Sequence, residues 1–85
     1  MDFYELDAFI KLAETLKFSK AVDLSAMSPS ALSRRMSRFE EEVGAALFDM
    51  DNRKVLLTER GKKFLAFALD AVAKRRALFC LDTIL

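Results

Sequence analysis

The stretch Ser-Pro-Ser-Ala-Leu-Ser-Arg-Arg-Met-Ser-Arg-Phe, residues 28–39, decides the fold, because it combines a helix start with an amphipathic pattern. The Ser28 hydroxyl can accept a bond from an otherwise unpaired N–H of the first turn, and Pro29 has no N–H to lose at the first helical position. Gly44 suits the left-handed position that ends a helix. One buried stripe is predicted by apolar residues at spacings of four, three and four, namely Leu32, Met36, Phe39 and Val43. We therefore predict a helix over residues 28–43.

The opposite face of this helix is rich in hydroxyls and positive charge. At about 100° per residue, Arg34 and Arg38 project away from the stripe, and Arg35 lies toward the other flank. Three serines share the outward side, namely Ser30, Ser33 and Ser37. Guanidinium groups bind phosphate or guanine, and short hydroxyls allow close approach of the backbone, as insertion into the DNA major groove requires. Position therefore favours DNA contact, with a merely solvated charged face as the alternative.

The last turn of the same helix is acidic, with Glu40, Glu41 and Glu42 in succession. Carboxylates at a helix C-terminus oppose the helix dipole. We expect these three side chains to gain nothing locally.

Two helices are predicted before this segment. The first covers residues 2–16, where apolar side chains recur at spacings of three and four: Phe3, Leu6, Phe9, Ile10, Ala13 and Leu16. Ser19 is expected to cap the second, a short helix with apolar contacts from Ala21, Val22 and Leu24. A break is expected from Ser25 to Ser28, so a short helix and a turn precede the arginine-bearing helix.

A small hairpin is predicted next. Segments 47–50 and 54–57 read as short strands, and Asp51-Asn52-Arg53 between them tolerates turn geometry. The tip carries Arg53 and Lys54. It can therefore lie along a sugar-phosphate backbone or reach into a minor groove, where narrow A·T segments concentrate negative potential.

Thr58 is expected to cap a final helix that runs to the end of the chain, about 27 residues or ~40 Å. Its apolar residues occur on more than one side, which exposes more apolar surface than a monomer of 85 residues can cover. A second copy is the expected cover, through Phe64, Phe67, Ala68, Ala71, Val72, Leu78 and Phe79. Shortening the chain before Phe64 is accordingly expected to give a monomer.

Two other covers for this helix remain open: its own domain, or the missing part of a larger protein. The apolar ending Thr83-Ile84-Leu85 indicates a fragment. Cys80 is expected to be a small apolar filler rather than a redox switch.

Composition restricts the classes of function. Eighty-five residues support one core, and 53% hydrophobic with 32% charged residues indicates a globular rather than a membrane-spanning or disordered chain. The N-terminus lacks the pattern of a signal peptide, so a cytoplasmic location is expected. The absence of His and the single Cys argue against zinc, triad and disulfide chemistry. Net charge is +1, but residues 1–27 have three basic against five acidic groups and residues 28–63 have eight against six.

An ordered set of motifs at consistent spacing resembles the N-terminal DNA-binding region of LysR-type transcriptional regulators over nearly all 85 positions. Its carriers are Asp2-Phe3-Tyr4-Glu5-Leu6 with Phe9 and Ala13-Glu14, Phe18-Ser19-Lys20-Ala21, Ser28-Pro29-Ser30-Ala31-Leu32-Ser33-Arg34, Phe39-Glu40-Glu41-Glu42-Val43-Gly44, Leu47-Phe48, and Leu57-Thr58-Glu59-Arg60-Gly61.

The resemblance implies a mainly α winged helix-turn-helix at residues 1–57 and a linker helix for dimerisation at 58–85. It implies a bacterial transcription regulator that is not an enzyme. Its third helix would read the major groove, the wing at Arg53 would approach the minor groove, and the homodimer could become a tetramer at full length. No cofactor is expected in this chain, and a small-molecule inducer would act on a further C-terminal domain.

Two departures from the family pattern shift the expected roles. Pro29 stands where the family often has a base-contacting Gln, so base reading is expected to shift to Ser30, Ser33 and Arg34. Ser25 stands where a large apolar residue is usual, and Leu24 is expected to rotate into that space. Segments 28–30 and 51–53 resemble the branch that regulates isoleucine and valine biosynthesis.

The residues expected to contact DNA form one set: Ser28, Pro29, Ser30, Ser33, Arg34, Arg35, Ser37, Arg38, Arg53 and Lys54. Arg35, Arg38, Arg53 and Lys54 are assigned to phosphates, which supply affinity and register rather than discrimination. The competing class is a helical protein-interaction module whose long apolar helix docks a partner. An enzyme is the least supported class, because the chain lacks His and a Gly-rich phosphate loop.

Overall fold

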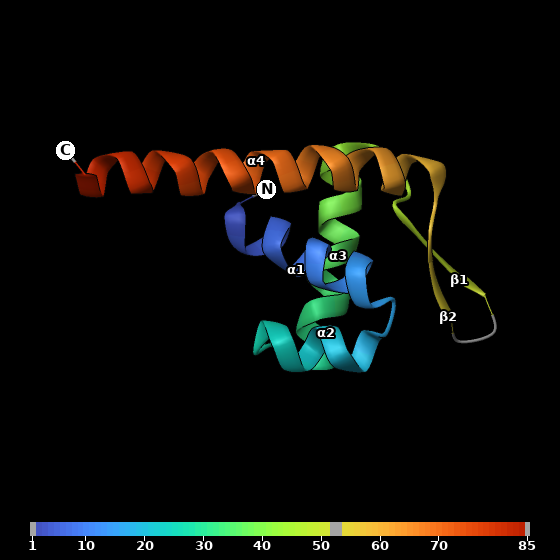
Figure 1. Cartoon of the computed structure of the whole chain (residues 1–85). Coiled ribbons are helices and arrows are strands. Elements are labelled where there is room, and N and C mark those ends of the chain that lie inside the picture. The colour runs from blue at the N-terminus through green and yellow to red at the C-terminus, as the bar shows by residue number, and fades with distance from the viewer. Residues whose placement is uncertain (1, 52–53, 85) are drawn as a thin grey trace.

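The computed structural model describes residues 2–51 and 54–84 as a mainly helical molecule of 50 × 26 × 20 Å (Figure 1). In chain order the elements are α1 (Phe3–Thr15), α2 (Phe18–Ser25), α3 (Pro29–Val43), β1 (Phe48–Asp51), β2 (Lys54–Leu57) and α4 (Glu59–Ile84). Helices α1, α2 and α3 pack beneath the first half of α4, and the antiparallel strands descend beside them (Figure 1). This arrangement confirms the predicted winged helix-turn-helix with a long final helix.

Local signals set the ends of α3 as predicted. The Ser28 hydroxyl accepts a hydrogen bond from the N–H of Ala31 at 3.2 Å, and Pro29 occupies the first helical position. Gly44 closes the helix with φ +82°, a conformation that glycine adopts without steric cost. The predicted helix over residues 28–43 is confirmed.

The predicted cap of α2 is wrong. Helix α2 begins at Phe18, with Lys17 in the cap position and no side-chain cap. Leu16 ends α1 in the left-handed region at φ 54°, so only Lys17 separates α1's cap from α2. Because the Lys17 carbonyl already accepts the N–H of Ala21 at 3.1 Å, Ser19 lies inside the first turn rather than before it.

Four aromatic rings from four elements form the centre of the core. The Phe9 ring of α1 lies 5.4 Å from that of Phe39 in α3, 5.2 Å from Phe48 in β1 and 5.5 Å from Phe64 in α4. Phe39 and Phe64 also meet edge to face at 5.3 Å. The predicted stripe of α3 faces this cluster, with Leu32, Met36 and Phe39 buried and Val43 partly buried. Burial of these rings therefore fixes α3 and the wing against α1 and α4.

The turn between α2 and α3 differs from the expectation for Leu24. Its side chain is 56% exposed and does not fill the space beside Ser25. The Leu24 carbonyl instead accepts a 3.0 Å bond from Lys11 Nζ, which also pairs with Asp7 at 2.7 Å. Ser25 Oγ is buried and has no hydrogen-bond partner among the described residues. Ala26 then takes φ 54°, which lets the chain turn toward α3.

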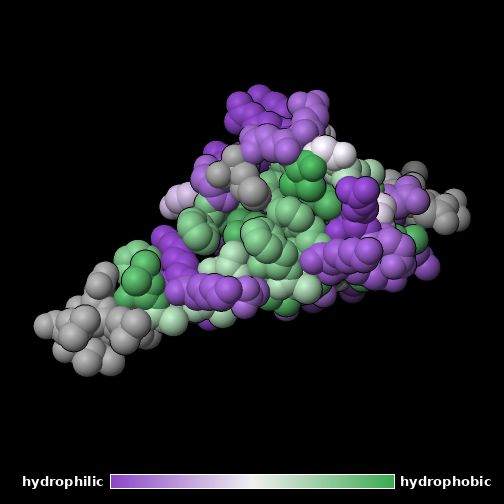
Figure 2. Space-filling view, turned by 90° about the horizontal axis from the view of Figure 1, so that it is seen from above, coloured by the Kyte–Doolittle hydropathy of each residue, from purple (hydrophilic) through white to green (hydrophobic). Residues whose placement is uncertain are grey.

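Helix α4 has two kinds of apolar residue. Ala68 is fully buried and Phe64 partly buried in the chain's own core, so assigning Ala68 to a surface between subunits was wrong. Other apolar side chains of α4 remain exposed, namely Phe67, Leu69, Leu78 and Phe79. The surface above α4 shows hydrophobic side chains gathered along its middle, with hydrophilic ones around them (Figure 2).

A guanidinium links the far half of α4 to the start of α1. The Arg75 Cζ lies 4.5 Å from the centre of the Phe3 ring and 5.2 Å from that of the Phe79 ring. This cation–π contact connects the two elements, while both rings remain exposed.

Candidate nucleic-acid interface

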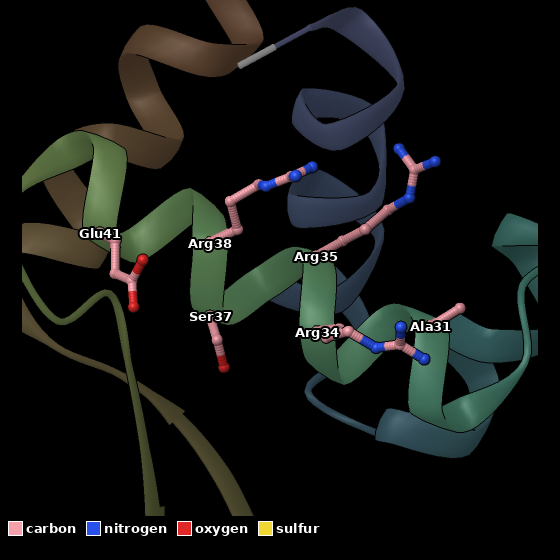
Figure 3. A pocket seen from close by; sticks show the side chains of 6 residues that line it. All are labelled: Ala31, Arg34, Arg35, Ser37, Arg38 and Glu41. Atoms are coloured by element: carbon pink, nitrogen blue, oxygen red, sulfur yellow. The ribbon is translucent and has the colours of Figure 1, made fainter.

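The outward face of α3 presents the hydroxyls and guanidinium groups that its sequence predicts. Ser30, Ser33 and Ser37 are exposed. Arg34 and Arg38 are exposed as well, and Arg35 is half-buried on the flank. These arginines line an open concavity along α3 together with Ala31, Ser37 and Glu41 (Figure 3).

The arginine side chains of α3 differ in their exposure: Arg34 and Arg38 are exposed, whereas Arg35 is half-buried. Arg35 and Arg38 extend from one side of α3, while Ser37 and Glu41 project from the other (Figure 3). Among the side chains that the structure describes, the salt bridges involve Lys11, Lys62 and Lys74, and none of them includes these arginines. The charge of Arg34 and Arg38 therefore faces solvent and is available to an external anion.

The N-terminal end of α3 is exposed at Ser28, Pro29 and Ser30. The Ser28 hydroxyl caps the helix and lies 3.4 Å from the hydroxyl of Ser30. Ser28 thus has a structural role at this end, whereas Pro29 has no polar side-chain group. The positive end of the helix dipole is at this same end, which favours a phosphate.

The hairpin stands beside α3 and forms the predicted wing. Its register pairs Phe48 with Leu57, Asp49 with Leu56, Met50 with Val55 and Asp51 with Lys54. Lys54 is exposed at the start of β2, as expected. Arg53, the other predicted cation of the tip, lies outside the described residues. The strand pair predicted around residues 47–57 is confirmed, with β1 beginning at Phe48 instead of Leu47.

A hydrogen-bonded joint fixes the wing to α3, and the sequence analysis missed it. Glu40 Oε2 accepts the N–H of Leu47 at 2.7 Å and that of Phe48 at 3.4 Å. The expectation that Glu40 gains nothing locally is therefore wrong. Its partners are backbone N–H groups at the start of the wing, and the type of residue at those positions does not indicate such a bond.

Thr58, directly after β2, completes this joint. Its N–H donates to the Leu47 carbonyl at 3.0 Å and its hydroxyl donates to the Ala46 carbonyl at 2.7 Å. The same hydroxyl accepts the N–H of Gly61 at 3.0 Å, which confirms Thr58 as the cap of α4. The C-terminal end of α3, the base of the wing and the start of α4 are thus connected through Leu47.

Glu41 lines the concavity along α3 together with the arginines, and it was not predicted as a residue of that surface. It lies three positions after Arg38 and four after Ser37, and helical spacing alone places it on their side. Its carboxylate gives the basic face one negative group.

Among the side chains that the structure describes, no group of three or more His, Cys, Asp and Glu could hold a metal ion. Over that same part of the chain, no helix has the length and apolar character needed to cross a membrane.

Comparison with known proteins decides between the classes of helical domain. Residues 3–62 match the family described as bacterial regulatory helix-turn-helix protein, lysR family. The chain belongs to this family. As a member of this family, it has the helix-turn-helix of a bacterial regulatory protein, and α3 belongs to that helix-turn-helix.

Curated relatives agree with this assignment. The lysR-family chain is 52% identical over 68 residues to the HTH-type transcriptional activator IlvY of Haemophilus influenzae, covering 80% of this chain and 23% of the relative. It is 40% identical over 78 residues to the HTH-type transcriptional regulator IlvY of Escherichia coli (strain K12), covering 92% and 26%. The chain thus spans about a quarter of the length of these relatives. They support the predicted resemblance to the isoleucine and valine branch.

Solved structures share the fold of this lysR-family domain. The complex of BenM_DBD with benA site 1 DNA has a TM-score of 0.92 at 26% identity, over 98% of this chain and 96% of that chain. Vibrio fischeri DarR in complex with DNA has a TM-score of 0.91 at 31% identity, over 98% and 28%. The winged helix-turn-helix predicted from sequence is confirmed by these likenesses.

Proposed function

We propose that this lysR-family domain binds double-stranded DNA with sequence specificity as a homodimer. In this proposal α3 enters the major groove and the wing lies on the adjacent backbone or minor groove. The observation that carries it is the face of α3, where Arg34 and Arg38 are exposed without an acidic partner among the described residues and three serines accompany them. The DNA complexes of BenM_DBD and DarR lend support, since both resemble this chain over 98% of its length.

Affinity and discrimination would come from different residues. Arg35, Arg38, Arg53 and Lys54 would contact phosphates, which set register and give salt-dependent affinity. Ser30, Ser33 and Arg34 would contact base edges, because they lie in the N-terminal half of α3 that enters a groove first. Arginine pairs well with guanine O6 and N7, so Arg34 is the residue expected to discriminate most strongly.

Homodimerisation would occur through α4. Phe67 is 57% exposed and Leu78 60% exposed, and water-exposed apolar surface of this kind favours a second copy. Phe79, Ala71 and Val72 would contribute from the same helix. Two copies would present two α3 helices to two half-sites. Packing of α4 against other parts of a longer chain is the alternative, and tetramers at full length would need contacts outside these residues.

Further expectations follow from the family assignment. We propose that the chain is not an enzyme, since its relatives are named as transcription regulators. It would act in the cytoplasm of a bacterium and need no cofactor of its own. A small-molecule inducer would act on sequence beyond these 85 residues.

Selection of bound duplexes from a random DNA pool tests the proposal. The 85-residue chain should enrich a two-fold related pair of short sequences, and the affinity for the enriched duplex should fall steeply with salt. Absence of enrichment, together with capture of a protein partner through α4, would favour the helical protein-interaction class.

A further inference from the structure

Glu40 holds the first residues of the wing with a single carboxylate oxygen. Its Oε2 accepts the N–H of Leu47 at 2.7 Å and the N–H of Phe48 at 3.4 Å, in a partly buried environment. The two donors precede and begin β1, while Glu40 itself lies in the last turn of α3. A hydrogen bond that an N–H donates to a carboxylate is stronger than one to a neutral acceptor, and a shielded N–H is costly to leave unpaired. The position of β1 relative to α3 thus depends on this carboxylate.

Leu47 transmits the same constraint to the second strand. Its carbonyl accepts the N–H of Thr58, directly after β2, at 3.0 Å. Its side chain is fully buried, so the residue has little freedom to shift. Glu40 is therefore connected through one residue to both ends of the hairpin.

We propose that Glu40 is a positioning residue for DNA binding, which acts by holding the wing at a fixed place beside α3. The inference rests on the proposed function, because it assigns to Glu40 the placement of Lys54 on the DNA. Glu40 itself bonds the wing instead of pointing to the concavity that the arginines line. Its effect on DNA would pass through the wing alone.

A role through charge and a role in positioning predict opposite changes in DNA affinity when the Glu40 carboxylate is removed. A carboxylate on a DNA-facing domain repels phosphates, so removing its charge should strengthen binding if electrostatics alone mattered. Removing an acceptor that holds the wing should weaken binding. Glu41 offers the matched comparison, since it carries the same charge at the next position and lines the α3 surface.

Three substitutions at Glu40 separate the effect of its negative charge from the effect of its side-chain length. Glu40→Asp keeps the charge but shortens the side chain by a methylene, whereas Glu40→Gln keeps the length and one acceptor oxygen. Glu40→Ala removes both. With the duplex selected by the unaltered chain as probe, we expect Glu40→Ala to bind about tenfold more weakly. Glu40→Gln should lie closer to the unaltered chain than Glu40→Asp does, and Glu41→Gln should bind as tightly or more tightly.

A coupling measurement distinguishes positioning from general loss of structure. Lys54→Ala should weaken binding in the unaltered chain, but cost less than about twofold when Glu40 is already Ala or Asp, because the wing is then misplaced. Base preference should not change in any Glu40 variant. Circular dichroism establishes that each variant is folded at the temperature of the assay. If Glu40→Ala is unfolded, the Asp and Gln variants and their Lys54 cycles carry the test.

Two results would overturn the inference. One is Glu40→Asp binding like the unaltered chain while Glu40→Gln binds more tightly, which is the order expected from charge alone. The other is an undiminished cost of Lys54→Ala in the Glu40→Asp background. Failure of the unaltered chain to select any duplex would instead refute the proposed function, so the two failures are distinguishable.

Discussion

Gly61 of α4 lies directly against the carbonyl of Leu47. A Cβ atom at position 61 would overlap the Leu47 oxygen and come within 3.0 Å of Leu57 Cδ2. Gly61 is buried in the first turns of α4, and its own N–H is held by Thr58 at 3.0 Å. Glycine is thus required here by close approach of two backbones rather than by an unusual φ.

Gly61→Ala is expected to lower the free energy of unfolding by about 1 to 3 kcal/mol, because the methyl group must displace backbone at the base of the wing. Chemical denaturation with circular dichroism measures this change. Gly44→Asn is the matched control: Gly44 has φ +82° but open space around its Cβ position, and Asn tolerates that conformation. The control should change stability by only a few tenths of a kcal/mol. Equal effects of the two variants would contradict the close approach.

Ser25→Ala is expected to stabilise the domain by about 1 kcal/mol, because a buried hydroxyl without a partner is removed. Ser19→Ala in the same helix is the control, since Ser19 is exposed and gains only the helix propensity of alanine. The difference between their denaturation midpoints isolates the buried hydroxyl. A Ser25 variant no more stable than the Ser19 variant would show that this hydroxyl is satisfied in solution.

Local signals in the sequence were sufficient for most of the fold. The cap at Ser28, the buried stripe of α3 and the closing Gly44 each depend on residues within a few positions of one another, and the structure has all three. Thr58 as the cap of α4 is of the same kind. The exposed position of Arg34 followed from helical geometry once the buried face was known.

Features that depend on tertiary packing could not be predicted in this way. Glu40 bonds to backbone N–H groups seven and eight residues away, and any residue type would supply those donors. Ala68 lies on the side of α4 that faces the chain's own core, and an all-round apolar helix does not reveal which side that is. The Leu24 side chain is exposed, and the Leu24 carbonyl near the end of α2 accepts a hydrogen bond from Lys11 Nζ.

Phe67→Glu and Leu78→Glu are each expected to prevent dimerisation while leaving the monomer folded, because both side chains are more than half exposed. Because the dimer is symmetric, each substitution occurs twice in the contact between subunits. A loss of about 3 kcal/mol or more in the free energy of association should raise the dimer dissociation constant at least about 100-fold. Analytical ultracentrifugation measures it. Point substitutions are a better test of the dimer than truncation before Phe64, because a truncated chain would lose the Phe64 ring from its core.

Leu56→Glu is the control for these substitutions. Leu56 is 44% exposed on β2, so it introduces the same charge at an exposed apolar position away from α4. It should leave the dissociation constant of the dimer unchanged. Persistence of the dimer in both α4 variants would exclude this helix as the contact between subunits.

Arg34→Ala and Lys54→Ala are expected to affect DNA binding in different ways. Loss of Arg34 should cost about 1 to 3 kcal/mol on the selected duplex and relax the preference at particular base pairs, because a base-edge contact is removed. Loss of Lys54 should weaken binding to all sequences alike and reduce the salt slope by about one unit per site, because a phosphate contact is removed. Titration of both variants against selected and scrambled duplexes at several salt concentrations measures both quantities. Both side chains are exposed and belong to different elements, so neither substitution disturbs the core. Identical salt slopes and identical base preferences in the two variants would mean that α3 and the wing do not make different contributions to affinity and base preference.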